Sequence, residues 1–284
     1  MNLVTRSLLL LVLSIFLAAC GGNKRESLQD RLQAGKLAPL EIYQEGIRQM
    51  AERNFQDARQ WFRVIETHAP NSPFFADAKL RIADTYFFDQ MATYIEASVE
   101  YKSFLTHFPN HRMADYATYQ YGMCFYTEIE RADRDQTSTW TAYSEFEALI
   151  DKYPISPYVP KAKEKIELCL LRLADSEFSV GYYYYRRGKG FEQSAELRLK
   201  RVINNYEGQY NELKTNFYLA ETLWRRKKYS EAIYYYRDID RRFPDSDYQP
   251  FVVDKLARFA RIEEDGRDPG ELGDEIEADP LKDQ

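Results

Sequence analysis

Five segments of the chain repeat one pattern of alanine, a bulky apolar residue and proline, and this pattern constrains the fold more than any other feature. The five alanines are Ala58, Ala97, Ala142, Ala195 and Ala232. Four positions later stand Phe62, Tyr101, Phe146, Leu199 and Tyr236. Twelve positions after each alanine stand Pro70, Pro109, Pro154, Glu207 and Pro244, so only the fourth segment lacks the proline. A fixed internal register of this kind is typical of repeat proteins.

The spacing predicts helices that end at the prolines. Residues four apart lie on one face of a helix, where alanine lets a partner helix approach and the bulky residue fills the space one turn later. Proline cannot continue a helix, and it restricts the residue before it. Ser72-Pro73 and Ser156-Pro157 then predict new helices, each with a serine N-cap and a proline at the first helical position.

The predicted fold class is all-α, a superhelix of five degenerate tetratricopeptide helix pairs with about ten to eleven helices. Gly46 and Ala220, 24 positions before Pro70 and Pro244, fit the small-residue position of that repeat. The proline positions are 39, 45, 53 and 37 residues apart, so each repeat carries an insert relative to the usual period of about 34.

These inserts suggest two groups of repeats. We expect an N-terminal group over 38–127, with repeats 1 and 2 and the start of repeat 3, and a C-terminal group over 128–262. The largest insert predicts one long linking helix at about 157–187, because the segment after Pro160 contains no proline and few glycines. A closing helix over Tyr248–Ile262 would cap the stack.

The first twenty residues read as an export signal for a lipoprotein. A short basic region precedes an apolar run that is too short for a permanent membrane span, and LAAC is similar to a bacterial lipobox. We therefore expect a signal peptide over 1–19, S-diacylglycerol and an N-acyl chain on Cys20, and a polar tether over 20–37. The chain, with Gly21 instead of an acid after the cysteine, resembles in this respect lipoproteins that are sent on to the outer membrane. The alternative is a plain secretory signal that happens to end in cysteine.

Negative charge is concentrated at one end of the sequence. The segment 263–284 carries ten acidic and two basic residues, a net charge of −8, whereas the whole chain has −6. We expect this segment to be a disordered acidic tail. The rest of the chain is close to neutral and has no basic block, which argues against nucleic-acid binding.

The sequence offers no catalytic or metal-binding motif. The histidines His68, His107 and His111 do not form a metal-ligand pattern, and no phosphate-binding or nucleophile motif occurs. We therefore expect no enzymatic activity, no metal and no cofactor other than the covalent lipid. Cys124 and Cys169 lie in apolar helical stretches, which favours buried free thiols over a disulfide.

Two further features suggest surfaces for a partner. The four tyrosines Tyr182–Tyr185 point all round a helix, so at least two must pack in the core while others could form an aromatic strip. Basic residues follow this run. They are Arg186, Arg187, Arg198, Lys200 and Arg201. They could be ordinary solvated charges or a docking face for an acidic partner.

Three segments, together with the lipobox and the repeats, resemble the BamD (YfiO/ComL) family of outer-membrane assembly lipoproteins. The segments are RADRDQT (131–137), FEALIDKYPISPY (146–158) and RLADSEFSVGYYYYRRGKGF (172–191). The resemblance implies a lipid-anchored scaffold on the periplasmic face of the outer membrane. It also implies binding to the POTRA domains of a BamA-like β-barrel insertase, to other lipoproteins of that complex and to unfolded barrel precursors. A generic periplasmic adaptor, for example one that organises peptidoglycan synthesis, is the alternative.

The resemblance also implies partner-binding residues. An arginine on the helix after the long one contacts the insertase in this family, and Arg198 holds that position here. Arg201 and Arg187 are added as its neighbours in the basic face. The precursor groove of the family lies in the N-terminal repeats, and we assign it to Tyr43, Phe74 and Phe75 from aromatic placement alone.

Overall fold

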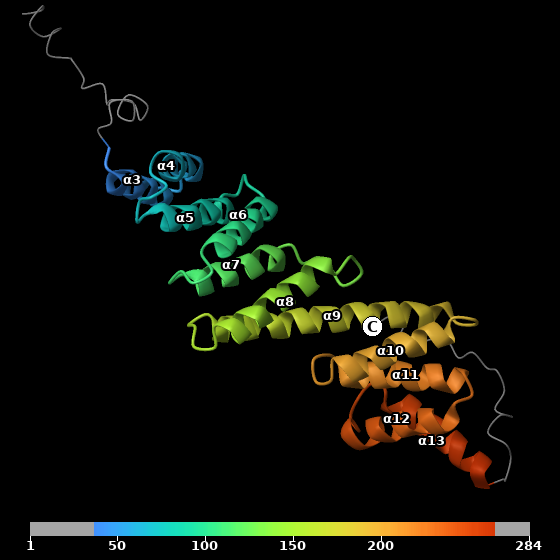
Figure 1. Ribbon diagram of the computed structural model, residues 1–284. Helices are drawn as coiled ribbons and strands as arrows, with labels where there is room; N and C mark the ends of the chain where they lie inside the picture. Colours follow the sequence, from blue (N-terminus) through green and yellow to red (C-terminus); the bar gives the residue numbers. More distant parts are fainter. Residues whose placement is uncertain (1–36, 265–284) are drawn as a thin grey trace, which may run out of the picture. The chain divides into compact units, whose positions relative to one another are not determined.

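The computed structural model describes residues 37–264, which form eleven α-helices and no strand (Figure 1). The helices are α3 (Pro39–Ala51), α4 (Phe55–His68), α5 (Phe75–Phe88), α6 (Tyr94–His107), α7 (Ala114–Tyr126), α8 (Thr137–Lys152), α9 (Val159–Arg187), α10 (Glu192–Asn205), α11 (Glu212–Arg225), α12 (Tyr229–Arg242) and α13 (Gln249–Glu264). The all-α prediction is confirmed. The signal peptide, Cys20, the tether up to residue 36 and the acidic segment after Glu264 lie outside the described residues.

The helices fall into two units, which are described separately: residues 37–78 and residues 79–264. In the first unit α3 packs on α4, and the contact depends on Gly46. A Cβ atom on Gly46 would lie 2.5 Å from Cε1 of Phe62, so only glycine lets the two helices approach this closely. Tyr43 covers the same ring, with 5.7 Å between the centroids of Tyr43 and Phe62.

The repeat positions all lie in the core. The five alanines and the five bulky residues four positions later have no exposed surface. In three of the repeats the preceding helix presents a glycine to the bulky residue: Gly46 to Phe62, Gly122 to Phe146 and Gly181 to Leu199. Sequence spacing missed Gly122 and Gly181 because the inserts shift both glycines out of the common register.

Tyrosine can replace phenylalanine in the core because an acid on the preceding helix binds its hydroxyl. The Tyr101 hydroxyl donates to Asp84 Oδ1 at 2.6 Å, and the Tyr236 hydroxyl donates to Glu221 Oε1. Asp84 also accepts hydrogen bonds from Tyr116 and from Arg81. Burial raises the pKa of Asp84 in spite of these hydrogen bonds. The cluster satisfies buried polar groups and is therefore part of the core.

Four helices end directly before the proline positions, as the spacing predicts, and each ends at an aromatic residue. Phe108, Tyr153, Tyr206 and Phe243 are the C-cap residues of α6, α8, α10 and α12. The fourth segment, which lacks the proline, turns instead at Gly208, whose φ of +74° lies in the left-handed region. Asn211 then caps α11 by accepting the Lys214 N–H at 2.9 Å.

The predicted start of the helices at Ser72-Pro73 and Ser156-Pro157 was wrong by about two residues, since α5 begins at Phe75 and α9 at Val159. The serine hydroxyls accept N–H groups two residues ahead, from Phe74 at 3.2 Å and from Tyr158 at 3.1 Å. Each serine thus closes a separate turn before the helix instead of capping it.

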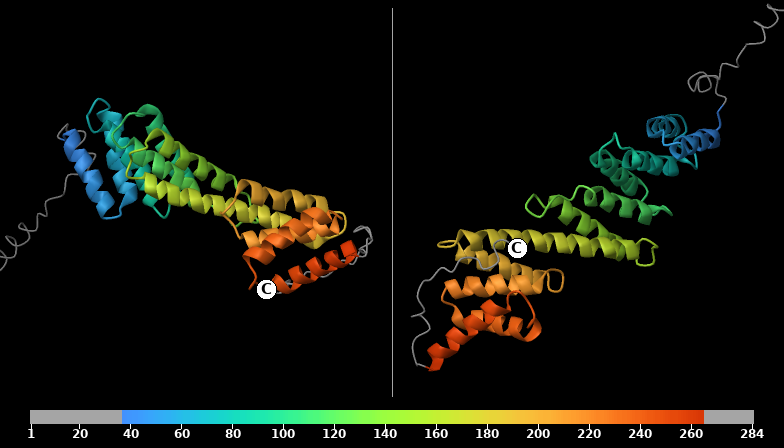
Figure 2. Two further views of the ribbon diagram at one scale, coloured as in Figure 1. Left: turned by 90° about the horizontal axis from the view of Figure 1, so that it is seen from below. Right: turned by 180° about the vertical axis from the view of Figure 1, so that it is seen from behind.

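The longest helix is α9, with 29 residues, close to the range of about 157–187 expected from the sequence. Its first half packs on α8 around Phe146, Leu149 and Cys169, and its second half packs on α10 and α11 around Phe178 and Tyr185. At about 1.5 Å per residue it is about 44 Å long. Figure 2 shows it extending from the green helices to the orange ones, so one helix contributes to two hydrophobic clusters.

Candidate partner-binding surface

The structure brings Arg198 and Arg201 to the same acidic residue. Arg198, on α10, donates from Nη1 to both carboxylate oxygens of Glu177 on α9, at 3.0 and 2.9 Å. Arg201 lies 3.7 Å from the same carboxylate. Both arginines remain partly exposed, so their guanidinium groups hold their positions and still face solvent. The ion pairs with Glu177 join α9 to α10 and hold these two arginines close together.

Arg187 occupies a different place. It is exposed at the end of α9, where its guanidinium carbon lies 5.8 Å from the Tyr183 ring centroid and 5.1 Å from that of Phe191. Glu177 and Arg187 are ten residues apart on one helix, which corresponds to about 15 Å. The three arginines predicted as one site are therefore a pair, Arg198 and Arg201, and a separate residue further along α9.

Helix α10 also carries a charged cluster centred on Glu196. Its buried carboxylate accepts from Lys200 and from Lys228, both at 2.8 Å, and from Arg226. Burial alone would raise the pKa of Glu196, but the hydrogen bonds and charges of these cations outweigh it and lower the pKa to about 2. Lys200 also donates from Nζ to Glu231 Oε2 at 2.7 Å. The cluster ties α10 to the turn before α12.

The four consecutive tyrosines are mostly part of the core, as their helical spacing predicts. Tyr185 is buried, and Tyr182 and Tyr184 are half-buried against the same hydrophobic cluster. Only Tyr183, with 55% of its surface exposed, faces solvent. An aromatic strip of several exposed tyrosines is therefore not formed.

The aromatic residues assigned to a precursor groove lie in the first unit. Tyr43 and Phe74 stack, with 5.4 Å between their ring centroids and 24° between their planes. Both rings and that of Phe75 are half-buried. The structure thus brings Tyr43 and Phe74 together, and their assignment to a groove stays a prediction.

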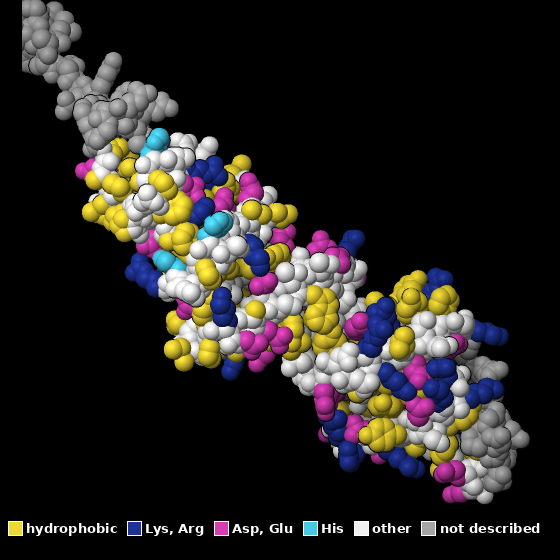
Figure 3. Space-filling view, viewed as in Figure 1, with side chains coloured by type: hydrophobic (Ala, Val, Ile, Leu, Met, Phe, Trp, Pro, Cys, Tyr) yellow, Lys and Arg dark blue, Asp and Glu magenta, His cyan; other side chains and the backbone are white. Residues whose placement is uncertain are grey.

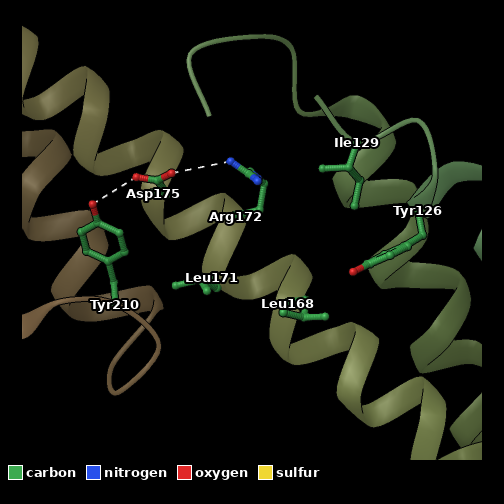
Figure 4. A pocket seen from close by; sticks show the side chains of 7 residues that line it. All are labelled: Tyr126, Ile129, Leu168, Leu171, Arg172, Asp175 and Tyr210. Carbon is green, nitrogen blue, oxygen red and sulfur yellow. Dashed lines mark hydrogen bonds and ion pairs between the residues drawn. The ribbon is translucent and has the colours of Figure 1, made fainter. Parts of the chain in front are cut away.

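A cavity of about 460 Å³ opens on one face of α9, and the sequence reasoning did not find it (Figure 4). Its lining residues are Tyr126, Ile129, Leu168, Leu171, Arg172, Asp175 and Tyr210. Leu168, Leu171 and Asp175 recur at helical spacing, and the two leucines are 41% and 44% exposed. An acid–arginine contact of 3.7 Å between Asp175 and Arg172 closes one end, where Tyr210 also donates to Asp175 at 3.0 Å. The cavity can take an apolar side chain.

Other kinds of site are absent from the described part of the chain. Within residues 37–264 no cluster of His, Cys, Asp and Glu could hold a metal ion. None of the helices in this range is both long enough and apolar enough to cross a membrane. Cys124 and Cys169 are buried free thiols, which confirms the preference for unpaired cysteines.

Comparisons with known proteins agree on one family. A family model described as "Outer membrane lipoprotein" (YfiO) matches residues 36–222. Proteins named "Outer membrane protein assembly factor BamD" are similar to the chain. The one from Rickettsia prowazekii is 25% identical over 244 residues, 86% of this chain and 93% of that protein. The one from Caulobacter vibrioides is 26% identical over 184 residues, 64% and 59% of the two chains. The one from Neisseria gonorrhoeae is 26% identical over 176 residues, 58% and 64% of the two chains. The match thus covers less than two thirds of the last two proteins.

Proposed function

Because the chain belongs to the YfiO family of outer-membrane lipoproteins, we propose that it is a non-enzymatic scaffold in the assembly of outer-membrane proteins. In this proposal lipid on Cys20 anchors it to the periplasmic face of the outer membrane. The folded repeats bind the POTRA domains of a BamA-like insertase, join the other lipoproteins of that complex and help to deliver unfolded β-barrel precursors. Anchoring and a preformed surface would raise the effective concentration of the partners at the membrane.

The observation that carries this proposal is the family match across most of the described repeats, taken with the basic face on α9 and α10. Arg198 and Arg201 stand on adjacent turns of α10 and are held by one carboxylate, Glu177. Pre-positioned guanidinium groups lose little side-chain entropy on binding, and they suit carboxylates of a partner.

The test is affinity purification of the tagged full-length lipoprotein from gently solubilised envelopes, with mass spectrometry of the proteins that accompany it. We expect a β-barrel protein with POTRA domains in near-stoichiometric amount, and its loss with Arg198→Glu. Because that substitution also breaks the Arg198–Glu177 ion pair, the control is the charge swap Arg198→Glu/Glu177→Arg, which restores the pair inside the protein.

The outcomes separate the roles of Arg198. If the swap fails to recover the barrel protein, Arg198 contacts the partner directly. If the swap recovers it, the ion pair has a structural role and the interface lies elsewhere. Recovery of peptidoglycan synthases without any barrel protein would overturn the scaffold proposal and favour a generic periplasmic adaptor.

A further inference from the structure

Two turns of the second unit contain only basic residues and glycine. Residues 186–189, where α9 ends, read RRGK, and residues 225–228, where α11 ends, read RRKK. We call the seven cations of these turns the basic edge. They are Arg186, Arg187, Lys189, Arg225, Arg226, Lys227 and Lys228. Basic residues stabilise the last turn of a helix, and this effect favours cations at both turns.

The two turns lie side by side. Arg225 donates from Nη1 to the backbone carbonyl of Tyr185 at 2.9 Å, and its guanidinium carbon lies 3.9 Å from the Tyr185 ring centroid. This contact joins the end of α11 to the last turn of α9. Figures 1 and 2 show both turns at the same end of the unit, and Figure 3 shows Lys and Arg side chains clustered there.

Part of this charge is neutralised inside the protein and part of it faces solvent. Arg226 and Lys228 share Glu196. Arg186, Arg187, Lys189 and Lys227 are exposed. The guanidinium of Arg186 lies 5.9 Å from the Tyr182 ring centroid, which holds the side chain in place and leaves its charge unchanged.

The last helix, α13, lies beside the helix that leads into one turn of the basic edge. Lys255 of α13 lies 5.1 Å from the Trp224 ring centroid and 3.7 Å from Glu221, so α13 packs beside the C-terminal half of α11. Its last turns carry the buried Ile262 and end at Glu264, at the same end of the unit as the basic edge (Figure 1). The next twenty residues, 265–284, hold eight acidic and two basic side chains, a net charge of −6.

We propose that the acidic segment 265–284 binds the basic edge of its own chain. The four exposed cations of the edge and the net charge of −6 on the segment are opposite in sign. Helix α13, which precedes the segment, ends at the same end of the unit as the basic edge (Figure 1). Twenty residues can extend to about 66 Å. Crossing the layers of helices from α13 to α9 requires about 30 Å, since packed helices are about 8–10 Å apart. Direct contact is needed, because salt screens charges beyond about 8 Å at physiological ionic strength.

One consequence rests on the proposed function. Arg187 belongs both to the basic edge and to the residues predicted to contact the insertase. A bound acidic segment would cover it, and an acidic partner surface would compete with the segment for the same cations. The segment would then favour partners that carry enough negative charge to displace it.

The test is zero-length cross-linking of the full chain with a carbodiimide, which joins carboxylates to lysine amines in direct contact. We expect cross-links from residues 265–284 to Lys189 and Lys227. Their yield should fall about fivefold or more when salt is raised from about 0.05 M to about 1 M. Arg186→Glu/Arg187→Glu should cause a similar fall. The matched control is Arg237→Glu/Arg241→Glu, which makes the same charge change toward the other end of α12 and should leave the yield unchanged.

Circular dichroism of each variant checks that the helices are intact. Absence of these cross-links at low salt would overturn the proposal, as would a yield that ignores the reversal at Arg186 and Arg187. The cross-links could also form between two copies of the chain, and mixing isotopically labelled with unlabelled protein tests this. Cross-links between labelled and unlabelled chains would refute binding within one chain. None of these results depends on recovery of a barrel partner, so this proposal and the proposed function can fail independently.

Discussion

The cluster around Glu196 should contribute measurably to the stability of the C-terminal repeats, and Glu196→Gln tests it. The glutamine keeps the size of the side chain but removes the charge shared by Lys200, Lys228 and Arg226. A pKa of about 2, against an ordinary 4.5, corresponds to about 3 kcal/mol at 1.36 kcal/mol per pKa unit. The three cations are about one-third exposed and can regain water, so we expect a loss of about 2 kcal/mol.

The contribution of Glu196 to stability should decrease as the pH falls. The pKa of Glu196 is lowered in the folded protein, so its contribution is fully present above the unfolded pKa near 4.5 and is lost as the pH falls toward 2. Wild type and Glu196→Gln should therefore differ by a constant amount near neutral pH. The difference should shrink progressively below pH 4.5.

The assay is urea unfolding followed by tryptophan fluorescence, with Trp224 close to the cluster as a reporter. The control is Glu231→Gln, because Glu231 contacts the same two lysines but is 47% exposed. Exposed ion pairs contribute at most about 1 kcal/mol to stability, so Glu231→Gln should change the free energy of unfolding very little. A loss below about 0.5 kcal/mol for Glu196→Gln, or a difference that does not change with pH, would refute the reasoning.

Three further predictions concern packing, reactivity and binding. Gly46→Ala should destabilise the first unit by about 1–3 kcal/mol because its Cβ would overlap the Phe62 ring, and Phe62→Leu in the same chain should recover part of the loss in thermal unfolding. Cys124 and Cys169 should resist thiol reagents at pH 8 until urea unfolds the protein, since burial raises their pKa values to about 12 and about 11; rapid labelling of the folded protein would contradict this. We add the cavity on α9 as a candidate contact for unfolded barrel precursors: Leu171→Glu should leave the unfolding midpoint unchanged, because Leu171 is 44% exposed, while lowering recovery of precursors with the purified protein; equal recovery would exclude the cavity as such a contact.

The sequence predicted the core well wherever one residue type repeats at one spacing. Ala142 and Phe146 were assigned to a helix–helix contact from the register alone, and both are fully buried. The small partner of Phe146 was not found, because Gly122 lies 24 residues before it, whereas Gly46 lies 16 before Phe62. A loop insert changes the distance along the chain without changing the contact, and spacing alone cannot detect that.

The candidate site was less predictable, because it depends on contacts between helices. The basic character of Arg198 and Arg201 was visible, but their shared partner Glu177 is on another helix, 21 residues before Arg198. An acid in that position is equally consistent with a solvated surface. The cavity on α9 was missed for a related reason. Leu168 and Leu171 look like core residues, and only the arrangement of neighbouring elements leaves them exposed.

The length of α9 has a consequence for how the second unit unfolds. In most repeat proteins each helix pair contacts only its neighbours, and cooperativity weakens along the stack. Here a single continuous helix is a structural member of two hydrophobic clusters. If the repeats around one half of α9 unfold, that half of the helix loses its packing partners and begins to unwind. The unwinding would then destabilise the hydrophobic cluster around the other half as well. We therefore expect α7 to α12 to open as one foldon, so that a partner bound to either half stabilises the whole.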